Sequence, residues 1–113
     1  MNRDSLEKML ASGHDSAMLR LTLARVLIDE GELDCAQGHL ENATKMDPNY
    51  TAAWKELGKL LQLTGDDHAA ASAWSKGLET AHAKGDKQAG KEMQVFLRRL
   101  ARNQAARRAQ PME

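Results

Sequence analysis

The sequence predicts a single all-α domain in which helical hairpins stack into a short solenoid. Ala, Leu, Glu, Lys, Gln, Arg and Met dominate its 113 residues, and these are strong helix formers. Apolar residues recur three and four positions apart along most of the chain, as on one face of a helix. The chain also resembles itself, because Leu6, Leu40 and Trp74 lie 34 residues apart.

The same shift of 34 residues brings further pairs of like residues into register. These pairs are Leu23 with Leu57, Leu27 with Leu61, Gly31 with Gly65, and Ala36 with Ala70. In each copy an apolar helix ends at the glycine, and the alanine lets the next helix approach closely. Pro48 then ends the second helix of the first copy, because proline fits only the first turn of a helix. The pattern predicts two hairpins, each followed by a turn.

The flanks of the two copies predict one further helix at each end. Asp4 is expected to cap a short first helix, and Gly85 and Asp86 separate the last helix from the second copy. In the last helix Leu97 fills the position that holds a small residue in both copies, so we expect no third repeat to pack there. The expected helices cover residues 4–11, 16–30, 33–46, 50–64, 67–84 and 87–104.

Within one domain these helices give five segments. Residues 1–15 form a short helix and turn, 16–48 the first repeat, 49–84 the second repeat, 85–104 a capping helix and 105–113 a frayed basic tail. Charge is uneven along this order: residues 1–50 carry 5 basic and 9 acidic side chains, whereas residues 86–113 carry 7 and 3.

The repeat resembles the tetratricopeptide repeat family, and more closely its small bacterial two-repeat proteins. The second copy shows the motif residues Trp54, Leu57, Gly58, Leu61, Gly65, Ala70, Trp74 and Gly77. The first copy shows Leu23, Ala24, Leu27, Gly31, Ala36, Leu40, Ala43 and Pro48. Arg20 stands where the first copy should have tryptophan, and His82 stands where the second should have proline. The motif implies that both tryptophans lie in the core.

The resemblance implies a protein–protein interaction module, since the first helix of each repeat lines a concave groove in this family. The outward positions of these helices and of the capping helix follow from helical periodicity. They are Leu21, Arg25, Ile28, Lys55, Lys59, Gln62, Lys91, Gln94 and Arg98. Five of them are basic, and Leu21 and Ile28 are expected to be exposed. We therefore expect a short, acidic and partly apolar peptide as the ligand.

Two alternatives remain open at this stage. The arginines from Arg98 to Arg108 could contact nucleic acid weakly, although no aromatic residues alternate with them. The chain could also be a self-associating structural module, so a homo-oligomer stays open. We do not expect nucleic acid to be the main partner.

Enzymatic chemistry is not expected from this sequence. The four histidines and Cys35 lack the spacing of a metal site, and no phosphate-binding or nucleophile motif occurs. We therefore expect no cofactor, no metal and no catalytic residue. The first residues form no secretory signal and no apolar run spans a bilayer, so we expect a cytoplasmic protein without a membrane partner.

Overall fold

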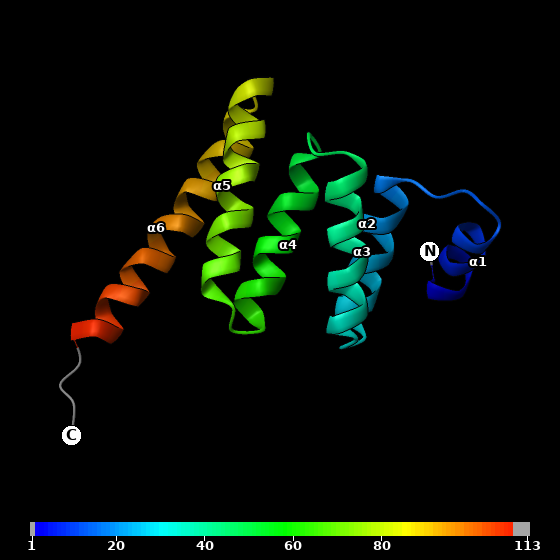
Figure 1. The fold of residues 1–113 in the computed structure, drawn as a ribbon, viewed down its shortest axis with the longest axis horizontal. Helices are drawn as coiled ribbons and strands as arrows, with labels where there is room; N and C mark the ends of the chain where they lie inside the picture. The colour runs from blue at the N-terminus through cyan, green and yellow to red at the C-terminus, as the bar shows by residue number, and fades with distance from the viewer. Residues whose placement is uncertain (1, 110–113) are drawn as a thin grey trace.

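The computed structural model describes residues 2–109, which form an all-α helical repeat fold. Its helices are α1 (Arg3–Ala11), α2 (Ala17–Asp29), α3 (Leu33–Met46), α4 (Thr51–Leu63), α5 (Asp67–Lys84) and α6 (Lys87–Ala109). Figure 1 shows them side by side in chain order, from α1 at one end to α6 at the other. The first five helices start and end within two residues of the predicted bounds.

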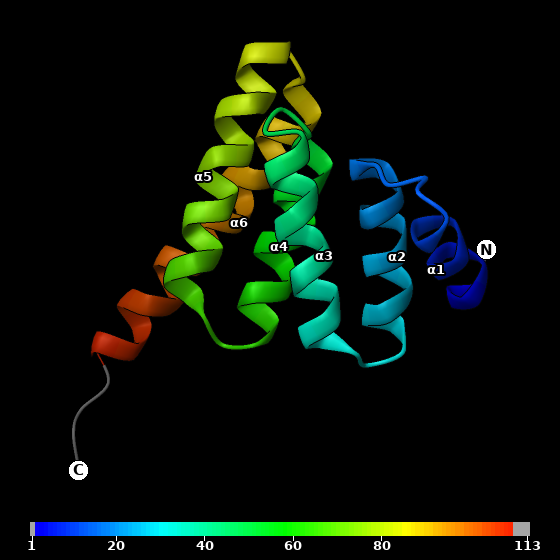
Figure 2. The ribbon, with the colours of Figure 1, turned by 45° about the vertical axis from the view of Figure 1, so that its right-hand side comes forward.

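The helices pack as two hairpins with one extra helix at each end. The hairpins are α2 with α3 and α4 with α5, while α1 contacts α2 and α6 contacts α5. Figures 1 and 2 both show α1 and α6 at opposite ends of the molecule, which measures 54 × 37 × 20 Å. In this arrangement α2, α4 and α6 are first helices of a hairpin, and α1, α3 and α5 are second helices.

The turns between the helices follow the sequence prediction at the glycines. Gly31 and Gly65 have φ angles of 80° and 91°, a left-handed conformation that glycine adopts without steric cost. Asp66 then caps α5 by accepting a hydrogen bond from the amide of Ala69 at 3.1 Å. The prediction for the first helix was wrong, because Asn2 and not Asp4 provides its cap.

Trp74 joins the second hairpin to the last helix. Its side chain has an exposed fraction of 1%, and its indole N–H donates to the backbone carbonyl of Lys55 at 3.2 Å. A Cβ atom added to Gly58 would overlap the indole ring, so α4 can lie this close to α5 only with glycine there. Trp54 is only half-buried, which corrects the expectation that both tryptophans lie in the core.

Arg20 occupies the tryptophan position of the first repeat and forms a polar cluster there. Its Nε and Nη2 atoms donate to the two carboxylate oxygens of Asp15, each at 2.8 Å. Its Nη1 atom lies 3.2 Å from Nδ1 of His39 on α3. A guanidinium group can only donate, so Nδ1 accepts and the His39 ring is neutral, with its proton on Nε2. This cluster ties α3 to the start of α2.

Helix α6 is longer than the sequence predicted. It continues to Ala109, so the predicted helix end at Gln104 was wrong. Arg107 lies 3.0 Å from the carboxylate of Asp67 at the start of α5, and this ion pair holds the last turns of α6 against α5. The rest of the predicted tail, residues 110–113, lies outside the described residues.

Alanine substitutions at two glycines should have opposite effects on stability. Gly58→Ala should lower the free energy of unfolding by about 1–3 kcal/mol, because the new methyl group displaces the Trp74 ring. Gly38→Ala should raise it by about 0.5–1 kcal/mol, because Gly38 lies inside α3 and its Cβ would meet nothing within 4 Å. Urea unfolding followed by circular dichroism measures both, and equal effects would contradict the close contact.

The stability of the fold should also depend on pH, through His39. Burial, and then the charge of Arg20, lowers the pKa of His39 below its ordinary value of 6.5, while Glu7 and Asp15 oppose this shift. The unfolded chain takes up the proton near pH 6.5, and the folded chain only at lower pH. Stability is therefore full above pH 6.5 and is lost as the pH falls toward the folded pKa.

Urea midpoints at about pH 7.5 and about pH 5.5 should show a larger loss for the wild type than for His39→Gln, which cannot titrate. An NMR titration of the His39 ring gives its pKa directly. A titration midpoint at or above 6.5 would contradict the neutral ring.

Candidate functional site

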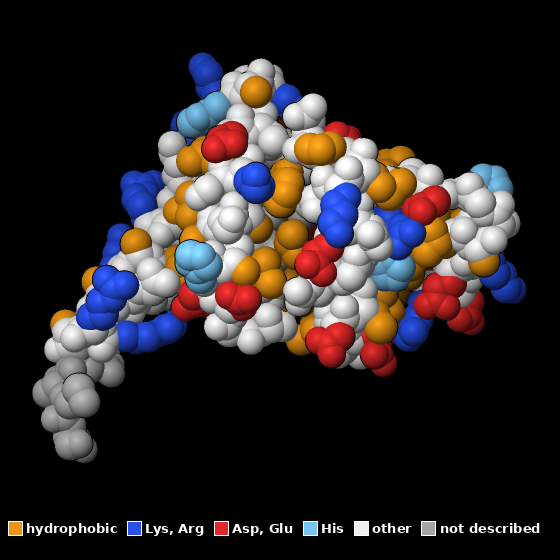
Figure 3. Space-filling view, viewed as in Figure 1, with side chains coloured by type: hydrophobic (Ala, Val, Ile, Leu, Met, Phe, Trp, Pro, Cys, Tyr) orange, Lys and Arg blue, Asp and Glu red, His pale blue; other side chains and the backbone are white. Residues whose placement is uncertain are grey.

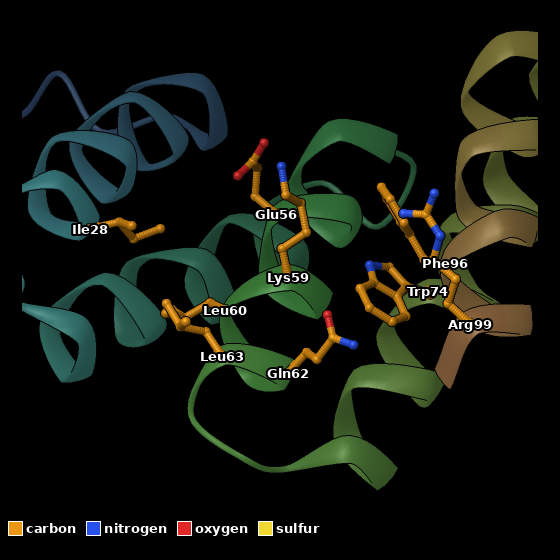
Figure 4. A pocket seen from close by; sticks show the side chains of 9 residues that line it. All are labelled: Ile28, Glu56, Lys59, Leu60, Gln62, Leu63, Trp74, Phe96 and Arg99. Atoms are coloured by element: carbon orange, nitrogen blue, oxygen red, sulfur yellow. The ribbon is translucent and has the colours of Figure 1, made fainter. Parts of the chain in front are cut away.

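The first helices of the hairpins, together with α6, line a groove on one face of the solenoid. It has a volume of about 650 Å³. The lining residues are Ile28 from α2; Glu56, Lys59, Leu60, Gln62 and Leu63 from α4; Trp74 from α5; and Phe96 and Arg99 from α6. Figure 4 shows these side chains, with the Trp74 ring between α4 and α6.

The floor of the groove is apolar and rigid. Trp74 is buried beneath it, and the ring centroids of Trp74 and Phe96 lie 5.1 Å apart in a tilted arrangement. Leu60 continues the floor along α4 with an exposed fraction of 2%. On the α2 side, Leu63 is 66% exposed and lies at the groove beside Ile28. Trp74 and Leu60 are thus almost fully covered by the protein itself, and the apolar surface that the groove offers belongs to Leu63 and to half-buried Ile28 and Phe96.

Two cations of the groove wall are available to a ligand. Neither Lys59 nor Arg99 lies within 4 Å of a carboxylate among residues 2–109, and both are exposed. Glu56 differs, because Arg25 lies 3.6 Å from its carboxylate across the gap between α2 and α4. The free positive charge therefore lies on α4 and α6, toward the Trp74 side of the groove.

Of the nine residues that the sequence assigned to the groove, the structure brings three together along it: Ile28, Lys59 and Gln62. Leu21 is buried with an exposed fraction of 2%, so the expectation that it is exposed was wrong. Leu19, Leu21 and Leu23 are all buried although successive members of this set lie about 200° apart around a helix. Neighbouring helices therefore cover α2 over more of its circumference than a single apolar stripe suggests.

Two other predicted groove residues are already paired at its edges. Arg25 is exposed and contacts Glu56, as described above, while the ammonium group of Lys55 lies 3.1 Å from the carboxylate of Glu92 on α6. Lys55 lines a separate depression of about 210 Å³ between the start of α4 and the start of α6. Sequence spacing could place these cations on the correct helices, but it could not show that carboxylates from other helices neutralise them.

The three predicted residues on the capping helix lie elsewhere. Lys91, Gln94 and Arg98 are exposed and do not line the groove. Phe96 and Arg99 form the groove side of α6, and helical periodicity places Lys91, Gln94 and Arg98 more than about 80° away from it around the helix.

The groove residues that sequence reasoning missed are Glu56, Leu60, Trp74, Phe96 and Arg99. Arg99 had a usable signal, since it follows Phe96 by three residues and therefore shares its side of the helix. Trp74 had none, because it belongs to a second helix and reaches the groove only through the space above Gly58.

The lining joins apolar side chains with two cations and one carboxylate, an arrangement that suits binding. Among residues 2–109, no three His, Cys, Asp or Glu side chains converge as a metal ion requires. Cys35, the one cysteine, is exposed on α3 and unpaired in the described structure. Within the same residues, no helix combines the length and apolar character that a membrane crossing needs.

Comparison with known proteins agrees with this architecture. The tetratricopeptide repeat profile matches residues 17–60. Over 99 residues the chain is 50% identical to the TPR repeat-containing protein PA0015 of Pseudomonas aeruginosa, covering 88% of this chain and 94% of that protein.

Solved structures give the same result. The solution structure of protein BPP2914 from Bordetella parapertussis has a TM-score of 0.82 and 45% identity, covering 98% of this chain and 96% of that one. A tetratricopeptide repeat domain protein from Salinibacter ruber has a TM-score of 0.73 over 77% of this chain and 97% of that one; at 22% identity it shows the shared fold alone. The repeat register, the stacked hairpins and these relatives show that the chain belongs to the tetratricopeptide repeat family, whose members are generally non-enzymatic scaffolds that bind other proteins.

Proposed function

We propose that this protein binds a short segment of another protein in the groove between α2, α4 and α6, and that the segment carries an acidic side chain next to a large apolar one. The observation that carries the proposal is the pairing of exposed apolar surface in the groove, above all on Leu63, with two cations that have no carboxylate within 4 Å among residues 2–109. Leu, Phe or Met on the ligand would contact the accessible apolar side chains of the lining, which are Leu63, Ile28 and Phe96. A carboxylate close to it in sequence would meet Lys59 or Arg99.

The apolar contact supplies affinity in this proposal. Burying one large apolar side chain against the floor is worth about 1.5–3 kcal/mol. Trp74 and Phe96 are held by packing before any ligand arrives, so little side-chain freedom is lost on binding. With two full repeats and one capping helix, the groove spans few residues of an extended chain. We therefore propose weak or moderate affinity for a single short segment.

The charges supply selectivity. Lys59 and Arg99 attract a carboxylate, and Arg99 can also hold it through two parallel hydrogen bonds. Glu56 lies on the α2 side of the same groove and would repel a second carboxylate there. The proposed ligand is therefore acidic at the Trp74 side only, and a uniformly acidic segment should bind less well.

Peptide display tests this proposal. Random peptides of about eight residues, selected on the immobilised full chain, should be enriched in Asp or Glu beside Leu, Phe or Met. For a selected peptide, Lys59→Glu combined with Arg99→Glu should weaken binding by about tenfold or more, since about 1.4 kcal/mol corresponds to a factor of ten. Isothermal titration calorimetry measures the dissociation constants.

The matched control is Lys45→Glu combined with Lys84→Glu, which changes net charge equally at exposed positions outside the groove. This control should bind the peptide with an affinity within about twofold of the wild type, because charges far from the groove are screened at physiological salt and contribute little to peptide affinity. Equal weakening in both variants, or selected peptides without acidic residues, would contradict the proposed groove.

A further inference from the structure

A basic stripe runs along α6 on the side that faces away from the rest of the molecule. We define it as Lys87, Lys91, Arg98 and Arg102, which lie four, seven and four residues apart and so share one face of a helix. All four are exposed, and buried Met93 and Leu100 lie on the opposite face against α5. Figure 3 shows Lys and Arg side chains gathered along α6.

The stripe is electrostatically uncompensated. None of its four cations lies within 4 Å of a carboxylate among residues 2–109, whereas Arg107, on another side of α6, pairs with Asp67. By the rise of a helix, the stripe is about 22 Å long. Such a row of like charges is costly to hold together unless solvent or an anionic partner screens it.

The opposite end of the molecule carries the complementary charge. Between α1 and the end of α2 lies an open depression of about 640 Å³, lined by Asn2, Arg3, Asp4, Glu7, Val26 and Glu30. Arg3 is the one cation of this lining, 2.6 Å from Glu7 and 3.9 Å from Glu30. Glu32 adds a further carboxylate close to Arg3. Figure 3 shows Asp and Glu side chains in this region, around α1 and the lower end of α3.

The repeat itself leaves both of these ends open. Helix α1 is a second helix without the first helix of its hairpin, and α6 is a first helix without its second. Figure 1 shows no helix on the outer side of α1 or of α6. A longer solenoid would cover these two sides with its next repeats.

From this charge complementarity we infer that the protein associates head to tail with a second copy of itself, the basic stripe of one copy contacting the acidic end of the next. A second copy fits better than a nucleic acid, because this chain supplies both complementary surfaces and its formal net charge at pH 7 is zero. Copies are therefore not held apart by net repulsion. The two surfaces differ, so the contact is heterologous and further copies can add.

The contact is electrostatic and not a tightly packed helical hairpin. The stripe presents four charged side chains and no large apolar one, while Leu97 packs against the core on the α5 side of α6, not where a further helix would lie. Association should accordingly be weak and strongly dependent on salt.

Sedimentation velocity on the full chain tests this inference at two ionic strengths. At about 0.01 M the Debye length is about 30 Å, and at about 1 M it is about 3 Å. We expect the weight-average mass to rise with protein concentration at low salt and to stay at that of a monomer at high salt. A monomer at every concentration in low salt would overturn the inference.

Charge reversal identifies the surfaces. Arg98→Glu with Arg102→Glu, and separately Glu30→Lys with Glu32→Lys, should each weaken self-association by about tenfold or more. Mixing the two variants should restore association, because each then offers the surface that the other needs. The variant Lys45→Glu with Lys84→Glu changes net charge in the same direction and by the same amount as the arginine variant, and it should associate like the wild type. Circular dichroism checks that all variants are folded.

Three other results would overturn the inference. A weight-average mass that still rises with concentration in about 1 M salt would place self-association on a different surface. Self-association of wild-type strength in both charge-reversal variants would do the same. Failure of the mixture to recover would show that the two ends do not contact each other. Binding of the stripe to a duplex or single-stranded oligonucleotide, without any self-association, would identify nucleic acid as its partner.

Discussion

The contact between the Trp74 ring and Gly58 determines how the second half of the molecule is arranged. The ring fills the space that a Cβ atom at position 58 would occupy, so it fixes how closely α5 lies against α4. It also lies beside Phe96, and through that contact it helps to position α6. The same ring closes the floor of the groove. One side chain therefore links the stability of the second repeat to the shape of the binding surface.

In the first repeat, polar groups pack at the position that holds tryptophan in the second repeat. Arg20 takes the place of a tryptophan, and it is satisfied by Asp15 and by the neutral ring of His39. A half-buried guanidinium needs such partners, because removing an unpaired charge from water costs roughly several kcal/mol of free energy. The two repeats thus share helix order and turns but differ in their interiors. Only the second repeat offers an aromatic floor to a ligand, and this asymmetry places the proposed binding site near α6.

The short length of the solenoid gives it two kinds of interaction surface. The groove is apolar with two free cations, so a ligand there gains from burial and from charge. The ends are polar, oppositely charged and without outer neighbours, so contacts there depend on charge alone. In a long repeat protein the ends are a small part of the surface. Here α1 and α6 are a third of the helices in residues 2–109, and the properties of the ends matter as much as those of the groove.

The sequence by itself determined the family, the order of the helices and the turns. These depend on local features, such as the 34-residue period and the glycines at 31 and 65, which can be read from the sequence alone. Tertiary structure decided which side of each helix faces the groove. The rotation of α6 follows from where Met93 and Leu100 pack against α5, and it brings Arg99 to the groove while turning Lys91 and Arg98 away. Burial of Leu21 and pairing of Lys55 with Glu92 likewise depend on neighbouring helices, because side-chain exposure and charge pairing are properties of contacts and not of sequence spacing.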